Sequence, residues 1–211
     1  MRTMMNRIRR NIFVLMLALG IPFVARAQHF PDELNFKLDW QVNAPVGYDY
    51  ADKLSGWGMN FEVAYEVSER WSLGAFASIH TNHGYAGRET IQLSPNEALT
   101  TDQLHSAFQV PFGALASFDL AYTPHLRPYV AGKIGAMYEQ NTTYLNTVGF
   151  YERPWGLYVS PEIGLNIYPQ RYGRFGFHVA VYYSYATNDT RLLNYQEDGK
   201  NSVGFRLGIC F

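Results

Sequence analysis

Residues 155–168 alternate between two kinds of position along the whole stretch. The odd positions are all apolar, and the even positions include Ser160, Glu162 and Asn166. A period of two indicates a β-strand with two unlike faces. Strands of soluble proteins usually end after about six residues, whereas a strand tilted across a bilayer needs roughly 9–11. The length of this stretch therefore favours a transmembrane strand.

Seven other stretches repeat the alternation and predict further strands. The eight expected strands are 36–43, 57–67, 71–79, 104–121, 127–138, 155–168, 175–185 and 203–211. Two residues depart from the regular pattern. Phe76 falls on the small, polar face of its strand, and Pro111 lies inside a strand, where its missing N–H predicts a bulge or local bend.

The expected connections alternate between short and long. The short ones are 68–70, 122–126 and 169–174, and the long ones are 44–56, 80–103, 139–154 and 186–201. This alternation is typical of an outer-membrane barrel with periplasmic turns and extracellular loops. The sequence therefore predicts an all-β fold, an eight-stranded antiparallel up-and-down transmembrane β-barrel with both ends of the barrel segment in the periplasm.

Aromatic residues collect near the ends of the expected strands, as they do at the two interfaces of a bilayer. One expected belt contains Phe36, Trp71, Tyr122, Tyr129, Tyr168 and Phe175, and the other contains Trp57, Tyr138, Trp155 and Tyr185. The core of a soluble sandwich, or of a lipocalin-like barrel in the periplasm, also uses alternating aromatics and is the alternative interpretation.

The N-terminus has the three parts of a secretory signal peptide. A basic segment, 1–11, precedes an apolar segment, 12–24, and the small-x-small sequence Ala25-Arg26-Ala27. We expect cleavage after Ala27, which gives a signal peptide at 1–27 and a β-barrel at 28–211. The alternative, an uncleaved membrane helix, would need about 20 apolar residues.

Composition narrows the classes of function. The chain has 211 residues and a net charge of -1, so it shows no bias toward nucleic acid or other polyanions. Its mean hydropathy of -0.19 is too low for a helical membrane protein, but it suits a barrel in which only alternate residues face lipid. Cys210 is the only cysteine, which excludes an intramolecular disulfide and a cysteine-based zinc site.

The signal peptide, the eight amphipathic strands, the alternating connections and the final strand SVGFRLGICF together resemble the small outer-membrane β-barrel family of the OmpA transmembrane domain and OmpX-like porin-family proteins. The resemblance implies insertion into the outer membrane of a Gram-negative bacterium. It also implies recognition by the barrel-assembly machinery of a C-terminal signal formed by Phe205, Leu207, Ile209 and Phe211. Gln28, directly after the cleavage site, resembles the start of mature Bacteroidota envelope proteins.

Charged residues on the inward faces are the first candidates for function. They are Lys37, Asp39, Glu62, Glu66, Lys133, Glu162 and Arg206. Symmetric hairpins would place Lys37 opposite Glu62 and Lys133 near Glu162. An unpaired charge in a narrow lumen is costly, so we interpret this set as a network of ion pairs that fills the barrel. Negligible conductance follows.

Histidines are the second candidates. His80, His83 and His105 could approach one another at the extracellular rim, while His178 points into the lumen. A metal site with Glu89, Glu97 or Asp102, or a hydrolase-like arrangement with Ser106, would use them. The spacing specifies neither, so we expect no catalytic residue, metal or other cofactor.

The four long loops are the third candidates because they combine tyrosines with charged residues, for example Tyr48, Tyr50 and Lys53. The leading hypothesis is a structural or binding protein, not an enzyme, whose partners are outer-membrane lipid and an extracellular ligand or envelope protein. Three alternatives stay open: a narrow pore for small molecules, a lipid-modifying enzyme inside the barrel, and a subunit of an outer-membrane export or assembly complex.

Overall fold

The computed structural model describes residues 33–94, 97–145, 148–170, 173–192 and 195–211, so the expected signal peptide lies outside the described residues. The chain divides into two units, Met1–Leu34 and Asn35–Phe211, and the second contains all of the sheet except the first residue of β1. The strands are β1 Leu34–Val46, β2 Gly58–Glu66, β3 Trp71–Ser94, β4 Glu97–Asp119, β5 Leu126–Leu145, β6 Val148–Glu152, β7 Trp155–Ile167, β8 Gly176–Leu192 and β9 Tyr195–Cys210.

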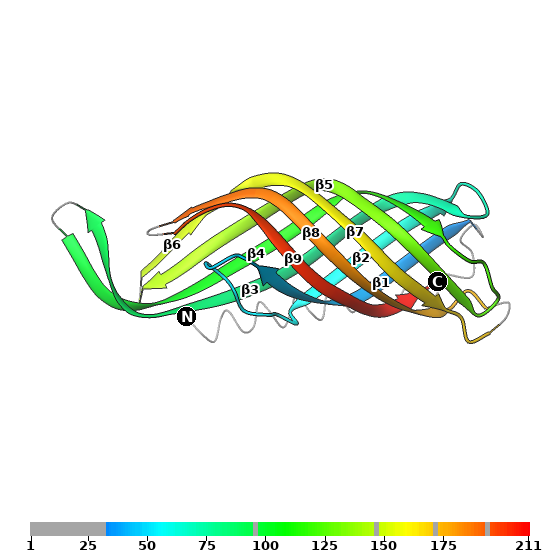
Figure 1. Ribbon diagram of the computed structural model, residues 1–211, viewed down its shortest axis with the longest axis horizontal. Coiled ribbons are helices and arrows are strands. Elements are labelled where there is room, and N and C mark those ends of the chain that lie inside the picture. Colours follow the sequence, from blue (N-terminus) through cyan, green and yellow to red (C-terminus); the bar gives the residue numbers. More distant parts are fainter. Residues whose placement is uncertain (1–32, 95–96, 146–147, 171–172, 193–194) are drawn as a thin grey trace. The chain divides into compact units, whose positions relative to one another are not determined.

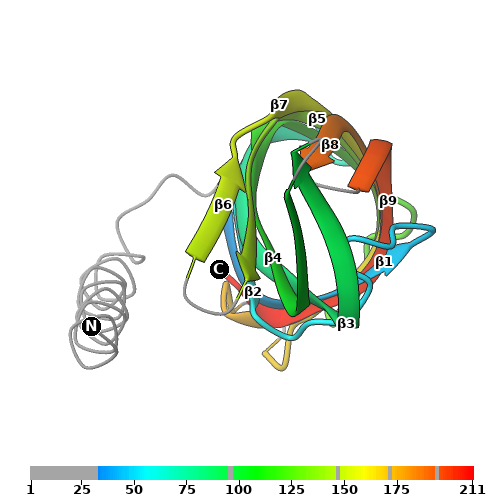
Figure 2. The same ribbon diagram turned by 90° about the vertical axis from the view of Figure 1, so that its left-hand side faces the viewer.

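The sheet closes on itself. Its order is β4-β3-β2-β1-β9-β8-β7-β5-β6, and β4 also pairs with β5, so that eight strands form a ring and β6 extends the rim beside β5. Figure 2 shows the ring along its axis. The registered strand pairs are antiparallel, including the closing pair β1–β9. The eight-stranded antiparallel barrel predicted from the sequence is confirmed. Within the described ranges, no helix is long and apolar enough to cross a membrane.

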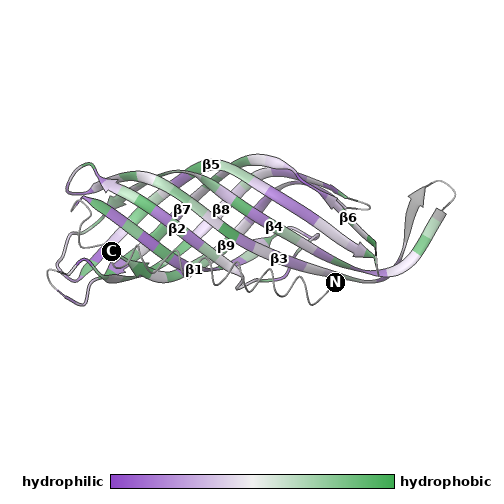
Figure 3. Ribbon diagram, turned by 180° about the vertical axis from the view of Figure 1, so that it is seen from behind, coloured by the Kyte–Doolittle hydropathy of each residue, from purple (hydrophilic) through white to green (hydrophobic). Residues whose placement is uncertain are grey.

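The two faces of the strands differ as the alternation predicted. In β8, buried and exposed residues alternate from Gly176 to Arg191. The exposed set is rich in large apolar side chains, and many of the buried side chains in the lumen are polar or charged. Figure 3 shows hydrophobic and hydrophilic residues alternating along the strands. Phe76 follows the pattern and lies inside, where its ring centroid is 5.7 Å from that of Tyr158.

Three of the four expected long loops are largely β-structure, which corrects the sequence-based assignment of 80–103, 139–154 and 186–201. β3 and β4 pair as far as Ser94 and Glu97, and β8 and β9 pair as far as Leu192 and Tyr195. The hairpin of β3 and β4 projects beyond the other strands at one end of the barrel (Figure 1). At the projecting end consecutive residues are exposed, as in the run 87–90, so the alternation of two unlike faces that marks a strand in the sequence is lost.

Pro111 produces no bulge, contrary to the prediction. β4 pairs with β5 without a shift through Pro111 and Met137, and the register with β3 is the same before and after the proline, at Phe112↔Ala77 and Gln109↔His80. In an antiparallel sheet each residue bonds to one neighbouring strand, so a missing N–H removes a bond on one side only. The strand therefore keeps its register.

The aromatic belts are partly as expected. Trp57, Trp71 and Trp155 are exposed on the outer face, but Tyr129 and Tyr168, assigned to the lower belt, are buried inside the barrel. Tyr129 pairs across the sheet with Gly164, whose missing side chain leaves room for the phenol ring in the lumen. The period of two therefore predicts whether an aromatic side chain faces outward or inward better than its position near a strand end does.

Candidate functional site

A row of charges with alternating sign crosses the middle of the lumen. Lys133 Nζ lies 2.8 Å from Glu162 Oε2 and also contacts Glu62 Oε1. Lys37 Nζ lies 3.5 Å from Glu62 Oε2 at one end of the row, and Arg206 Nη1 contacts Glu162 Oε2 at the other. The side chains of Glu62, Lys133, Glu162 and Arg206 are at most 1% exposed. Each buried charge therefore has a partner of opposite sign, which is the condition for tolerating it.

A chain of hydrogen bonds joins Asp39 to this row. The distances are 2.5 Å from Asp39 Oδ1 to His178 Nδ1, from His178 Nε2 to Tyr129 Oη, and from Tyr129 Oη to Glu162 Oε1. Ionised carboxylates only accept, and the single hydroxyl hydrogen of Tyr129 goes to Glu162. His178 bridges Asp39 and Tyr129 through its two ring nitrogens. Asp39 also accepts from Asn60 Nδ2 at 2.9 Å, so its charge is shared by two donors.

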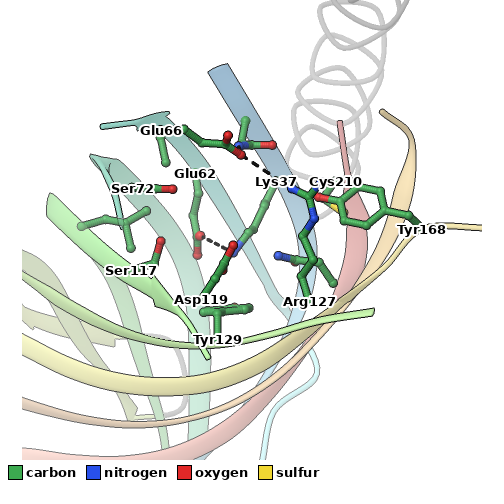
Figure 4. A pocket seen from close by; sticks show the side chains of 14 residues that line it. Lys37, Glu62, Glu66, Ser72, Ser117, Asp119, Arg127, Tyr129, Tyr168 and Cys210 are labelled. Atoms are coloured by element: carbon green, nitrogen blue, oxygen red, sulfur yellow. Dashed lines mark hydrogen bonds and ion pairs between the residues drawn. The ribbon is translucent and has the colours of Figure 1, made fainter. Parts of the chain in front are cut away.

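A small pocket of about 30 Å³ opens from the charge row toward the end of the barrel that contains the short turns. Figure 4 shows Lys37, Glu62, Glu66 and Arg127 around it. Glu66 Oε1 accepts from Asn35 Nδ2 at 2.7 Å and lies 3.7 Å from Arg127 Nη1. A space of this size holds roughly one or two water molecules. It can hydrate the lower end of the charge row.

The opposite mouth is covered by residues 47–57, which we call the lid. Tyr48, Tyr50 and Ala51 are buried, although they lie between strands and not within one. The hydroxyl of Tyr48 is 3.1 Å from Thr190 Oγ1 on β8, and that of Tyr50 is 3.1 Å from Thr143 Oγ1 on β5. The lid thus bonds to β5 and β8, neither of which is a neighbour of β1 or β2 in the ring.

Beneath the lid lies a further ion pair, Lys200 Nζ with Glu139 Oε1, both buried. The ammonium of Lys200 is 4.2 Å from the ring centroid of Tyr48, a cation–π contact with the lid. The rings of His105 and Tyr50 pack at a tilt of 45°, with 4.6 Å between their centroids. Burial lowers the pKa of His105 and raises the pKa of Tyr50, so both side chains are neutral at pH 7.

The three rim histidines do not meet. His80 is buried and lies 2.8 Å from Gln109 Oε1, while His83 is exposed on the outer face. Two residues three positions apart on a strand point to opposite faces. The prediction missed this because it treated the segment as a loop. Ser106 pairs with His83 on the outer face, away from the buried His80 and His105. Throughout the described ranges, no group of three or more His, Cys, Asp or Glu side chains could hold a metal ion.

The structure brings the predicted inward charges together, with Glu66 at the pocket and the other six in the middle of the lumen. Sequence reasoning missed the pair Lys200–Glu139 because both residues were assigned to loops. The alternation of Glu139, Asn141 and Thr143 with outward residues continues past Tyr138 and could have revealed the pair.

The C-terminal residues lie where the barrel closes. Phe205 and Leu207 are exposed on the outer wall, on the same face as Ile209. Phe211 stacks on Phe36 with 5.7 Å between ring centroids, and the backbones of these two residues exchange hydrogen bonds of 2.8 and 3.0 Å. The last residue therefore completes the pairing of the two ends of the sheet.

No protein-family model matches the chain, and no curated protein matches it. Among solved structures, Neisserial surface protein A (NspA) aligns over 85% of this chain and 96% of its own, with a TM-score of 0.52 and 10% sequence identity. The chain shares its barrel fold with NspA. The outer membrane protein OprG from Pseudomonas aeruginosa covers 84% of this chain and 93% of its own, with a TM-score of 0.47 and 12% identity. The attachment invasion locus protein Ail of Yersinia pestis covers 84% and 96%, with 0.40 and 18%. At 10% identity the likeness to NspA establishes the fold alone, and the function must be argued from the residues themselves.

Proposed function

We propose that this chain is an integral outer-membrane β-barrel protein that acts by binding through its extracellular hairpins, and that its lumen is closed to solutes. The observation that carries the proposal is the filled lumen. The charge row and the hydrogen-bonded chain of Asp39 and His178 fill the middle of the barrel, and the lid covers its mouth. An interior filled with paired side chains leaves the hairpins as the surface available to a partner.

The outer wall supports a membrane location. The middle section of the wall carries exposed apolar side chains all around the ring. Examples are Phe61, Ile134, Ile163, Val181 and Leu207. A soluble protein rarely exposes a continuous apolar surface of this extent. Lipid is the solvent that such a band requires.

The hairpins above this band carry the residue types of a binding surface. Tyr85, Leu104, Tyr144 and Tyr151 are exposed on strands held by paired backbones, and the guanidinium of Arg153 lies 5.2 Å from the ring centroid of Tyr151. Rigid strands lose little entropy when a partner binds. Tyrosine and arginine on such a support are common anchors of interfaces.

We expect the purified protein to give negligible conductance in planar lipid bilayers, because the paired side chains of the charge row and the buried tyrosines of the lid fill the lumen. The measurement is single-channel recording, with swelling of sugar-loaded liposomes as a second assay. A general porin reconstituted in the same lipid provides the positive control. Large, stable currents from several preparations would contradict the closed lumen and favour the alternative of a narrow pore.

Shortening the longest hairpin tests the binding role. Ala86 and Gln103 are cross-strand partners, so replacing residues 87–102 by Asn-Gly should close a tight turn at that register. We expect the shortened protein to fold and to lose any partner that the tagged parent retains stoichiometrically after gentle solubilisation, as measured by quantitative mass spectrometry. A partner retained by both forms would indicate binding through the wall or the turns, as in a complex subunit, and would contradict a role for this hairpin.

A further inference from the structure

The lid has an outward side as well as an inward one. Leu54 and Trp57 are 69% and 80% exposed, the two highest values among the large apolar side chains that the structure describes. Only a few residues earlier in the same segment, Tyr50 and Ala51 are fully buried in the mouth. A single short segment therefore places two side chains in the lumen and two apolar side chains outside the barrel.

The outward side of the lid lies at the upper edge of the apolar wall. The carbonyl oxygen of Trp57 accepts from Thr81 N at 3.1 Å, one residue beyond β2, and the outward residues Phe61 and Val63 of that strand belong to the wall. The lid is also bonded to the wall itself, because Trp40 Nε1 donates to the carbonyl oxygen of Gly56 at 2.7 Å.

Trp40 is part of the lipid-facing surface. It is half exposed, and its ring packs edge-on against Phe205 with 5.7 Å between centroids. Its indole N–H thus ties a wall residue to the end of the lid. Lys53, which precedes Leu54 in the lid, is also exposed, and its ammonium group lies 5.8 Å from the ring centroid of Tyr85 on β3. Apolar side chains, indole and a cation together match the acyl chains, interface and phosphates of a lipid leaflet.

We propose that the lid docks on lipid of the outer leaflet through Leu54 and Trp57, and that this contact holds the mouth of the barrel closed. The inference rests on the membrane location proposed above. The lid is then a lipid-dependent closure: removing the outward contacts releases Tyr50 and Tyr48 from the mouth while the strands stay paired. Lipid is favoured over a protein partner because the two side chains continue the apolar wall.

Gly84 on β3 provides an independent way to displace the lid. A Cβ at this position would lie 2.3 Å from the carbonyl oxygen of Tyr50 and 3.1 Å from Cα of Ala51, so any larger residue must move the lid backbone. Gly87, on the same strand, has nothing within 4 Å of an added Cβ. Gly84→Val should therefore open the lid, and Gly87→Val should not. This pair calibrates the assay.

The reporter is a single cysteine on the buried side of the lid, Ala51→Cys in a Cys210→Ser background, reconstituted in lipid nanodiscs. Labelling by a charged maleimide follows the population of the open lid when opening is fast. We expect slow labelling of the reporter and of its Gly87→Val form, and much faster labelling of the Gly84→Val form. Leu54→Ser with Trp57→Ser should raise the rate several-fold, whereas Trp57→Phe should keep it near the parent value.

Trp155→Ser is the matched control, because Trp155 is also exposed in the upper belt but lies on β7, away from the lid. It should leave the labelling rate unchanged. Equal rates for the parent and for the double serine variant would overturn the inference, as would an equal increase with Trp155→Ser. Flotation of the same samples with lipid separates the two proposals. A chain that does not float contradicts the membrane location. A chain that floats but whose labelling rate is unchanged by the double serine substitution contradicts only the inference.

Discussion

Replacing Glu162 by alanine should lower the free energy of unfolding by about 3–5 kcal/mol, the usual cost of removing one partner from a buried ion pair. The carboxylate of Glu162 contacts Lys133, Arg206 and Tyr129 at the centre of the lumen. Without it, both cations have fewer partners in a site that excludes bulk water. The side chains around them cannot move to solvent, because the charge row is closed by the ring of strands.

Urea unfolding in lipid vesicles, followed by tryptophan fluorescence, measures this loss. Glu162→Gln keeps the shape and one acceptor but removes the charge, so we expect an intermediate loss. Combining it with Lys133→Met removes one charge of each sign and should recover part of the stability, because coupled residues are not additive. If Glu162→Ala were as stable as the parent, the lumen charges would have to be hydrated, and the closed-lumen proposal would lose its support.

The faces of the strands, and with them the residues of the charge row, could be predicted from sequence because a barrel repeats one simple constraint. Each inward position has two neighbours on adjacent strands, so an inward charge such as Lys133 needs an inward partner such as Glu162. In an outer-membrane barrel, lipid on the outer side makes the alternation strong wherever a strand crosses the membrane. The prediction of the strand faces therefore rests on the contrast between an apolar outer wall and a polar lumen.

Where that contrast disappears, prediction from sequence became weaker. At the projecting ends of β3 and β4 both faces carry polar residues, so strands were assigned as loops, and His80 and His83 were placed together although they lie on opposite faces. The lid has no period at all. Its inward turn depends on two tyrosine hydroxyls that reach threonines far away in sequence and on the absence of a side chain at Gly84, contacts that only the closed ring brings together.

Ile163→Arg should cost about 2–4 kcal/mol of unfolding free energy in a bilayer, because a cation at the midplane loses its hydration. Ile163 is 57% exposed on the outer wall and pairs with Val130 and Val181, so the new charge would meet only apolar neighbours and lipid. Vesicle-based unfolding of the parent and the variant under identical lipid and salt conditions measures the difference.

Leu157→Arg is the depth control, since Leu157 lies on the same face of β7, is 66% exposed, and sits beside the belt residue Trp155. Near an interface the same substitution should cost only about 0–1 kcal/mol, because arginine reaches the headgroups. If water surrounded the wall, both positions would face water, and Ile163→Arg would not cost more unfolding free energy than Leu157→Arg. A graded cost therefore requires a bilayer around β7, whereas equal, small costs would mean that water surrounds the wall and that both the membrane location and the lipid-held lid are wrong.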